Sequence, residues 1–358
     1  MNELIDVVVD GKTYQAAEGS LLTDLLIKET IKVPYFCYHE SLGADGNCRM
    51  CMVEIEGQKR PQIACDTLVK KDMVVDTKND TIKKVRTDIL ELELVNHPVD
   101  CPTCDQAGEC SLQDFYMDYG LHESKISISE KVKHAKHVDL GSNVMLDQER
   151  CVLCARCTRF TDKITHTHEL GIVGRGDEAK VTIMPGRPLN NPYAMNVVDL
   201  CPVGALTSKD FRFSQRVWFL QTVNSVCHGC AKGCNIYIDH NKIKYQDDVI
   251  YRFRPRRNDE VNGFFICDEG RLSYKELQEN RQETPLLNFS QVTPKAAIQK
   301  AKELLEKHKK NITILVDANL FSEEMEAILE FAKSVNANVF SPLEVYADEN
   351  FKDDMLKS

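Results

Sequence analysis

The chain has 358 residues, which is too long for one ordinary domain, so we expect several small ones. Its formal net charge of −10 argues against a nucleic-acid partner, because phosphates repel an acidic surface. Fifteen cysteines without a secretory signal predict metal ligation in a reducing compartment rather than disulfides. No apolar run approaches the roughly 20 residues that span a bilayer, so we expect no direct membrane span.

The first 80 residues follow the order of a β-grasp ferredoxin, which is a hairpin, a helix, a cysteine-bearing loop and further strands. The expected elements are a strand over 4–9, a turn at Asp10-Gly11, a return strand from Lys12, a helix capped by Ser20 through about Glu29, and a strand over 52–56.

Later segments give a mixed pattern of helices and strands. Apolar residues at helical spacing predict a helix over 81–96, residues 138–146 resemble a strand, and the charge-rich stretch 246–260 predicts an exposed loop. The cysteine-free end predicts one βαβ unit. Its elements are a helix over 294–307, a buried strand over 312–316, a helix from Ser322 to 334 and a strand over 337–340.

Fifteen cysteines and one histidine sort, with none left over, into four sets of four potential iron–sulfur ligands. The sets follow one another without interleaving. They are Cys37, Cys48, Cys51 and Cys65; His97, Cys101, Cys104 and Cys110; Cys151, Cys154, Cys157 and Cys201; and Cys227, Cys230, Cys234 and Cys267. Four clusters in one soluble chain predict the transfer of single electrons over a distance that one centre does not cover.

The third set has the spacing of half a two-cluster bacterial ferredoxin. A C-x2-C-x2-C run starts at Cys151, and Cys201, followed by proline, supplies the remote fourth ligand. The positions of the other ferredoxin set hold no cysteine: they are Thr161, Asn191, Ala194 and Val197. One ligand set is complete and the other wholly absent, which predicts a ferredoxin-like fold with one retained 4Fe–4S site.

The first set has the C-x2-C core of plant-type 2Fe–2S sites, but ten residues separate Cys37 from Cys48, where plant-type sites have four. Gly43 and Gly46 lie in this longer loop. Glycine lets backbone amides approach the sulfurs, and such hydrogen bonds tune the reduction potential.

In the second set His97 replaces a thiolate, so the site carries one negative charge fewer and we expect a higher potential. A lone histidine at a helix end is more often not a ligand. The three cysteines that follow His97 have no other candidate for a fourth ligand, which favours ligation.

The fourth set again joins three close cysteines to a remote one, which predicts a cluster of cubane type. Structural zinc is the competing interpretation. Zinc sites usually pair two C-x2-C knuckles, however, so a triad with a distant fourth ligand fits a cubane better. Cysteines also serve as small buried hydrophobes, but the use of all fifteen argues against this alternative.

In this order the four sets resemble the large iron–sulfur subunit, of G type, of bacterial respiratory complex I, the proton-pumping NADH–quinone oxidoreductase. The resemblance covers about residues 1–275. The segments that carry it are PYFC at 34–37, GNCRMC at 46–51, HPVDCPTC at 97–104, GEC at 108–110, CARCTRF at 154–160 and DLCPVGALT at 199–207. It implies one 2Fe–2S cluster on the first set and 4Fe–4S clusters on the other three.

The resulting fold class is multidomain α+β. We expect a β-grasp 2Fe–2S ferredoxin domain at 1–80, a His–Cys 4Fe–4S cluster domain at 81–137, a ferredoxin-like 4Fe–4S domain at 138–220, a molybdopterin-oxidoreductase-type 4Fe–4S domain at 221–280 and a short partial α/β domain at 281–358. Molybdopterin enzymes usually have lysine where this chain has Glu269, and too little chain follows to bind the cofactor, so no molybdopterin is expected.

The resemblance implies an electron-transfer subunit of an oxidoreductase, without a catalytic residue or substrate site of its own. Its expected partners are the NADH/FMN-binding subunit and the iron–sulfur subunits on the quinone side. Its expected location is peripheral, on the cytoplasmic side of the bacterial inner membrane. Family members usually continue for several hundred residues, so the chain is either naturally short or a partial sequence.

An iron–sulfur subunit of an NAD-linked hydrogenase or formate dehydrogenase is the alternative. Those relatives share the first two sets but usually keep both ferredoxin cubanes. The absence of cysteine at positions 161, 191, 194 and 197 argues against them.

Overall fold

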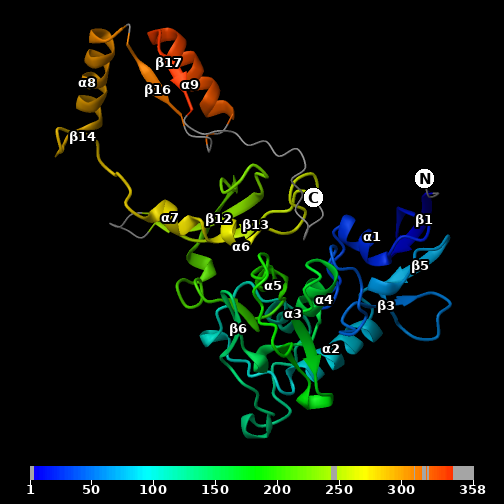
Figure 1. Cartoon of the computed structure of the whole chain (residues 1–358). Helices are drawn as coiled ribbons and strands as arrows, with labels where there is room; N and C mark the ends of the chain where they lie inside the picture. The colour runs from blue at the N-terminus through cyan, green and yellow to red at the C-terminus, as the bar shows by residue number, and fades with distance from the viewer. Residues whose placement is uncertain (1–3, 243–247, 310, 317–319, 321, 342–358) are drawn as a thin grey trace.

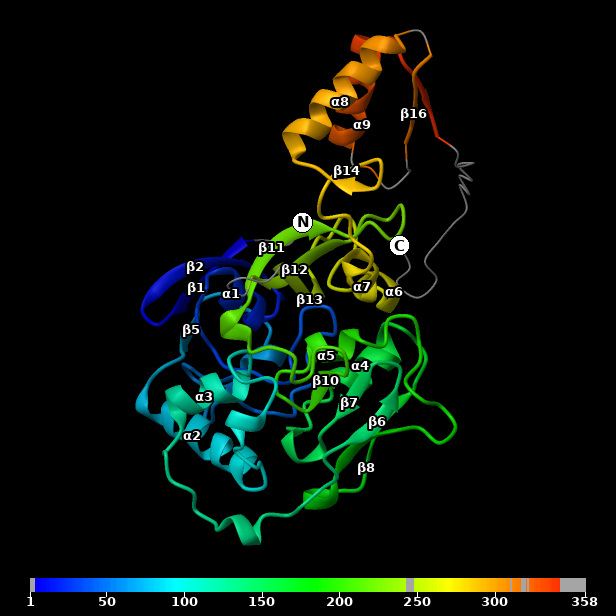
Figure 2. The same ribbon diagram turned by 90° about the vertical axis from the view of Figure 1, so that its left-hand side faces the viewer.

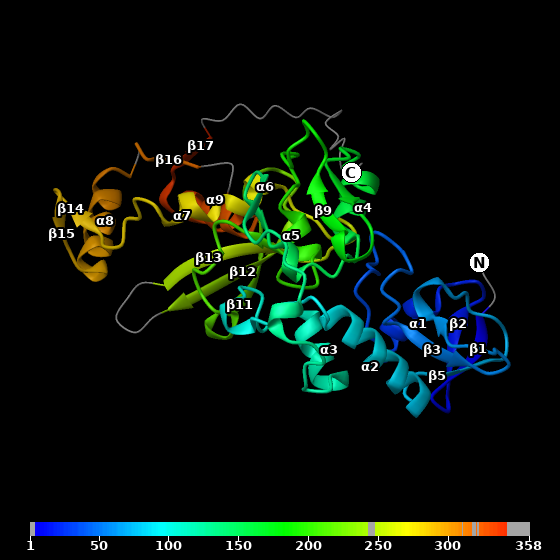
Figure 3. The same cartoon turned by 90° about the horizontal axis from the view of Figure 1, so that it is seen from below.

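A computed structural model of the chain describes residues 4–242, 248–309, 311–316, 320 and 322–341. The chain forms a series of small units, coloured from blue to red in Figure 1. Seen from below in Figure 3, the N-terminal unit and the C-terminal unit lie at opposite ends, with the cysteine-rich units between them.

The first unit is a five-stranded sheet with one helix. Strands lie in the order β2-β1-β5-β3-β4, with β1 antiparallel to β2 and parallel to β5. Its elements are β1 Leu4–Val9, β2 Lys12–Ala17, α1 Leu22–Lys28, β3 Met52–Ile55, β4 Gln62–Ile63 and β5 Met73–Asp76. Alternate residues of β1, such as Val7 and Val9, pack with Leu22 and Leu26 of α1. This arrangement confirms the predicted β-grasp order.

The predicted cap of the first helix is wrong. The Ser20 hydroxyl donates to the carbonyl oxygen of Ala17 at 2.7 Å, and the helix begins two residues later, at Leu22. The N-cap position is held by Leu21, which has no side-chain cap. A serine near a helix start also favours local turn bonds, and here the turn bond forms instead.

The second unit contains two helices, α2 Asp80–Leu94 and α3 Ser111–Tyr119. The Asn79 side chain caps α2 by accepting from the backbone N–H of Ile82 at 2.9 Å. Arg86 of α2 is almost fully buried and donates to the Met52 carbonyl oxygen and the Tyr119 hydroxyl. This one side chain therefore ties α2 to the first sheet and to the end of α3.

The third unit holds two small sheets and two short helices. Its elements are β6 Val138–Gly141, β7 Val144–Leu146, α4 Arg156–Lys163, β8 Leu170–Val173, β9 Lys180–Ile183, α5 Asn196–Leu200 and β10 Leu206–Ser208. The sheets run β10-β7-β6 and β8-β9. The single strand expected over 138–146 is a hairpin, because the chain turns at Gly141 and Ser142, both with positive φ.

The fourth unit is a three-stranded antiparallel sheet, β11-β12-β13, followed by two helical turns. Its elements are β11 Gln221–Val226, β12 Asn235–Lys242, β13 Asp248–Pro255, α6 Asp268–Leu272 and α7 Tyr274–Gln278. In Figures 1 and 2 this sheet lies between the C-terminal unit and the rest of the chain.

The exposed loop predicted over 246–260 is wrong for most of its length, because β13 occupies it; residues 246 and 247 lie outside the described residues. Phe253 points into the core and is 1% exposed. Arg252 and Arg254 point to the other face, where the buried carboxylate of Asp239 on β12 accepts from both at 2.7 and 2.6 Å. These two charges are paired within the sheet, so a high charge content did not mean an exposed loop.

The C-terminal unit confirms the predicted βαβ pairing, since β16 lies parallel to β17. The elements are β14 Leu286–Leu287, β15 Ser290–Gln291, α8 Pro294–Lys307, β16 Thr313–Leu315, α9 Ser322–Val335 and β17 Asn338–Phe340. The strand expected to be buried over 312–316 is not: Leu315 is 69% exposed, and Val316 is its buried residue. Residues 342–358 of the predicted last domain lie outside the described residues.

The part of the chain that the structure describes contains no helix with both the length and the apolar character needed to cross a membrane.

We expect Asp239→Asn to destabilise the chain by roughly 3 kcal/mol, because it removes the buried anion that Arg252 and Arg254 share and leaves Glu109 as the remaining partner of Arg252. In the folded chain burial by itself would raise the pKa of Asp239. The hydrogen bond from Arg254 and the charges of Arg252 and Arg254 outweigh burial and hold this pKa below its ordinary value. The measurement is the urea midpoint of the anaerobically purified chain by circular dichroism. Asp259→Asn, which removes an exposed partner of Arg257, is the control and should leave the urea midpoint nearly unchanged. Equal losses in the two variants would contradict this assignment.

Candidate iron–sulfur sites

The first ligand set converges beside the N-terminal sheet. Cys37, Cys48, Cys51 and Cys65 are all buried. The thiol of Cys37 hydrogen-bonds with those of Cys48 and Cys65, and Cys65 with Cys51, so the four sulfurs form one contiguous group. The hydrogen bond from Cys48, then that from Cys65, holds the pKa of Cys37 well below its ordinary value. Four adjacent buried sulfurs fit the 2Fe–2S site predicted here.

The loop of the first set uses its two glycines differently. The Gly46 amide hydrogen-bonds to the Cys37 sulfur, as predicted, and its φ of +73° is one that L side chains rarely adopt. A Cβ at Gly46 would also lie 3.0 Å from Ile63 Cδ1. Gly43 instead donates its N–H to the His39 carbonyl oxygen at 2.8 Å, so it shapes the loop rather than the sulfur environment.

The third ligand set lines a small, largely apolar cavity. Its sulfurs come from the chain before α4, from the first turn of α4 and from the residue after α5. All four cysteines line the cavity, together with Leu146, Val152, Ala155, Arg156, Val181, Val203, Ala205 and Leu206. Burial raises the pKa of each thiol, that of Cys154 to about 12. Buried thiolates need a nearby cation, which the iron of a cubane supplies, so the donor set fits the predicted cluster.

The positions of the missing ferredoxin set are filled by core. Thr161, Asn191, Ala194 and Val197 are all buried. The Asn191 amide donates to the Glu169 carboxylate. The same stretch docks the fourth unit, because Met195 N–H donates to Asp268 Oδ1 at 2.9 Å and Asp268 N–H to the Pro192 carbonyl at 2.7 Å. A segment that binds a cluster in two-cluster ferredoxins thus forms an interdomain contact here.

The cysteines of the second set lie in the loop between α2 and α3. A Cβ added at Gly204 would lie 2.2 Å from Cys104 Sγ, so only glycine fits opposite this sulfur. Burial raises the pKa of Cys104 and raises that of Cys110 to about 11. Arg150, which immediately precedes the third set, makes a two-pronged ion pair with Asp100 at 3.0 and 2.8 Å.

The structure places the His97 ring at the wall of a cavity that Cys48 and Cys151 also line. Burial lowers the pKa of His97 to about 4, which keeps the ring neutral at pH 7, as a metal ligand must be. Its Nδ1 accepts from the Val99 N–H at 3.1 Å. Ligation through Nε2 puts the proton on Nδ1, so binding of iron by Nε2 would require this hydrogen bond to be given up. The assignment of His97 as the fourth ligand therefore rests on its place in the sequence.

The fourth set sits at the start of the three-stranded sheet. Cys227 follows the first strand, and its N–H donates to the Cys234 carbonyl oxygen at 2.7 Å. Cys267 caps α6, its sulfur accepting from the Gly270 N–H at 3.3 Å. Cys230 is exposed. Burial raises the pKa of Cys234 to about 11. A Cβ at Gly270 would lie 2.9 Å from Cys227 Sγ and 3.2 Å from Cys267 Sγ, so these two sulfurs lie close together.

Across the described residues, no three histidine, cysteine, aspartate or glutamate side chains are spaced to hold a single metal ion.

The third set lies next to both the first and the second. The Asn47 amide, next to Cys48, donates to the Leu153 carbonyl, next to Cys154, at 3.1 Å, and the Ser111 N–H, next to Cys110, donates to the Pro202 carbonyl, next to Cys201, at 2.8 Å. Such contacts hold the loops of neighbouring sets together, as electron hopping between centres requires.

Three arginines that the ligand spacing does not single out belong to these sites: Arg150, Arg156 and Arg159. All three are buried. Arg156 donates to the Leu200 carbonyl at 3.1 Å, and its guanidinium lies 5.9 Å from the centre of the Tyr35 ring. One feature of the sequence could have indicated these arginines: they are interspersed with the cysteines of the third set.

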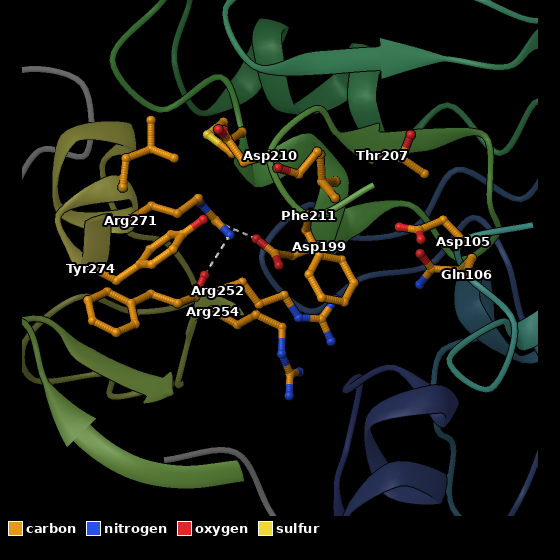
Figure 4. Close-up of a pocket in the computed structure, with 15 residues that line it drawn as sticks. Asp105, Gln106, Asp199, Thr207, Asp210, Phe211, Arg252, Arg254, Arg271 and Tyr274 are labelled. Carbon is orange, nitrogen blue, oxygen red and sulfur yellow. Dashed lines mark hydrogen bonds and ion pairs between the residues drawn. The ribbon is translucent and has the colours of Figure 1, made fainter. Parts of the chain in front are cut away.

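A further cavity lies where the second, third and fourth units meet (Figure 4). Its arginines are paired. Arg271 binds Asp199 of the third unit. Arg252 binds Asp239 of its own unit and Glu109 of the second unit. These ion pairs connect the units to one another across the cavity.

Comparison with known proteins gives the same succession of sites. Four family models match in order: a 2Fe-2S iron-sulfur cluster binding domain over 2–80, the NADH-ubiquinone oxidoreductase-G iron-sulfur binding region over 86–125, the ferredoxin-like domain of NADH-quinone oxidoreductase subunit 3 over 141–207, and the molybdopterin oxidoreductase Fe4S4 domain over 220–279. The multidomain α+β fold class is thereby confirmed.

Named relatives decide the family. The chain is 36% identical over 343 residues to the NADH-ubiquinone oxidoreductase 75 kDa subunit of Reclinomonas americana, over 93% of this chain and 48% of that protein. It is 37% identical over 289 residues to the G subunit of NADH-quinone oxidoreductase from Rickettsia bellii, over 79% and 41% of the two chains. The chain belongs to the family of G-type subunits of NADH-quinone oxidoreductase. It spans about half the length of the curated relatives it matches, or less.

A further family relative and a solved structure add to this. The G subunit of the Streptomyces coelicolor enzyme is 34% identical over 339 residues, 92% of this chain and 40% of that one. A chain in the crystal structure of an NAD+-reducing [NiFe]-hydrogenase in the H2-reduced state is 26% identical with a TM-score of 0.52. The match covers 60% of this chain and 91% of the hydrogenase chain, so part of the fold is shared with that class of enzyme.

We expect Gly270→Ala to prevent assembly of the fourth centre, with a loss of about four iron atoms per chain. The new Cβ would lie 2.9 Å from Cys227 Sγ and 3.2 Å from Cys267 Sγ, where ligand sulfurs must sit. Iron analysis and EPR of the anaerobic chain measure this. The matched control is Gly229→Ala, whose Cβ meets the same Cys227 sulfur at an ordinary 3.6 Å and should leave the iron content unchanged. Full iron content in the Gly270 variant would show that the fourth centre assembles in spite of the added Cβ and would contradict this prediction.

Proposed function

We propose that the chain is an electron-transfer subunit of the peripheral arm of NADH–quinone oxidoreductase (complex I). In this role it relays electrons from the NADH/FMN-binding subunit toward quinone through iron–sulfur clusters. The observation that carries the proposal is the order of four ligand sets in a chain of this family, with the loop of the third set hydrogen-bonded to those of the first and the second.

The proposed centres are one 2Fe–2S cluster and three 4Fe–4S clusters. The 2Fe–2S ligands are Cys37, Cys48, Cys51 and Cys65; the 4Fe–4S ligands are His97, Cys101, Cys104 and Cys110, then Cys151, Cys154, Cys157 and Cys201, then Cys227, Cys230, Cys234 and Cys267. When bound, each cluster accepts and releases single electrons. The chain holds the sulfurs in place, excludes water with apolar walls, and supplies amide and arginine donors near them.

The proposed domain boundaries are 1–80, 81–137, 138–220, 221–280 and 281–358. Matches to family models over 2–80, 86–125, 141–207 and 220–279 support the first four. No molybdopterin is proposed, because Glu269 stands where those enzymes usually have lysine.

The proposed partners are the NADH/FMN-binding subunit and the iron–sulfur subunits toward quinone, and the proposed location is peripheral, on the cytoplasmic side of the bacterial inner membrane. The names of the relatives support membership of such a complex.

An iron–sulfur subunit of an NAD-linked hydrogenase or formate dehydrogenase is the second candidate, favoured by the hydrogenase structure that shares part of the fold. Such relatives usually keep both ferredoxin cubanes. Here the four positions of the second cubane are packed into the core, which favours complex I.

We expect about 14 iron atoms and about 14 labile sulfides per anaerobically purified chain, as one 2Fe–2S and three 4Fe–4S clusters require. Colorimetric iron and sulfide assays, with zinc by mass spectrometry, measure this. Stoichiometric zinc with little iron would remove the electron-transfer proposal in favour of a structural scaffold.

We expect His97→Cys to lower the reduction potential of the second centre, because a thiolate adds one negative charge to the site. Redox titration followed by EPR measures the potential of each centre, and the other three spectra should be unchanged. If no spectrum changes, His97 is not a ligand.

A further inference from the structure

Helix α4 joins the third ligand set to the first. It carries Cys157 in its first turn, and two residues later Arg159 turns back toward the loop between Cys37 and Cys48. Arg159 Nη1 donates to the carbonyl oxygens of Gly43, Leu42 and Ala44 at 3.0, 3.3 and 3.4 Å. Arg159 Nη2 donates to the carbonyl oxygen of Cys37 itself. One guanidinium thus contacts four peptide groups of the loop that holds the first set.

Further contacts fix the same loop to the third unit. Lys163, one turn along α4, donates to the Leu42 carbonyl at 3.2 Å. The Asn47 amide, next to Cys48, donates to the Leu153 carbonyl at 3.1 Å, next to Cys154. Arg159 is 8% exposed, and its closest carboxylate is Asp45, with Nε 3.8 Å from Oδ1. The cation is therefore largely shielded from water and only loosely neutralised.

These contacts give a physical reason for the long first gap. Plant-type 2Fe–2S sites need only four residues there, whereas this chain has ten. The carbonyls of Leu42, Gly43 and Ala44 belong to the added length and point at Arg159. Buried carbonyls need donors, and a planar guanidinium with several N–H groups serves more of them than an ammonium does.

We propose that Arg159 is a positioning residue that fixes the first centre against the third and raises the reduction potential of the first. This inference rests on the proposed function. A cation beside Cys37 attracts the electron that a reduced cluster gains. In a buried site water screens this attraction only weakly, so the cation favours the reduced state. The fork of the guanidinium also holds the Cys37 peptide at a fixed distance from α4.

The experiment is a redox titration by EPR of the full chain, purified anaerobically. Arg159→Gln should lower the midpoint potential of the 2Fe–2S centre, because the cation is lost. Arg159→Lys should stay closer to wild type, since it keeps the charge and loses part of the fork. Asp45→Asn should move the midpoint the opposite way, because it removes the carboxylate that offsets Arg159.

The matched control is Arg60→Gln, which removes the same charge from an exposed position of the same unit and should leave the midpoint unchanged. If Arg159→Gln fails to retain the first cluster, Asp45→Asn and Arg159→Lys carry the test, because both keep a cation at position 159. A purely structural role predicts an unshifted midpoint in Asp45→Asn and would overturn the inference, as would equal shifts in Arg159→Gln and Arg60→Gln. A wild-type chain without any 2Fe–2S signal would instead overturn the proposed function.

Discussion

The arrangement of the cysteine-rich units depends on one constraint, the burial of cysteine sulfurs away from water. Burial raises the pKa of the third-set thiols, so as thiolates they are costly without a cation close by. Iron supplies that cation, and its binding then contributes to folding free energy. Cluster binding therefore explains how small units with modest apolar cores remain folded. It also explains why most of the cysteines lie on short loops beside the sheets and at helix ends.

Paired charges join the units to one another. Asp239 gathers two arginines inside the fourth sheet, and Arg252 extends that network to Glu109 in the second unit. Arg271 binds Asp199 of the third unit. Buried ion pairs contribute little net stability, but removing one partner is costly, so they favour one relative placement of the units over others. Centres that exchange electrons need such fixed separations.

Three predictions from the sequence failed, for different physical reasons. The stretch around β13 looks exposed because it is charged, yet Arg252 and Arg254 find their anion across the sheet. Ser20 looks like a cap, yet its hydroxyl satisfies a turn carbonyl first. The strand at 312–316 is apolar, yet Leu315 remains exposed in the small C-terminal unit. Only the charged stretch fails because the partner of its side chains lies outside the local window; Ser20 forms one local bond instead of another, and Leu315 lacks a covering layer.

By itself the sequence predicted the number, order and composition of the proposed ligand sets, because each set lies within a short stretch whose spacing is local. It also determined the β-grasp order, and it places no cysteine at the positions of the second ferredoxin set, Thr161 and its three companions. Only the tertiary structure decided which sets are neighbours. It alone also shows that Arg159 donates hydrogen bonds to a loop more than 110 residues earlier in the chain. Such contacts arise from how separate units dock, and no local spacing encodes that.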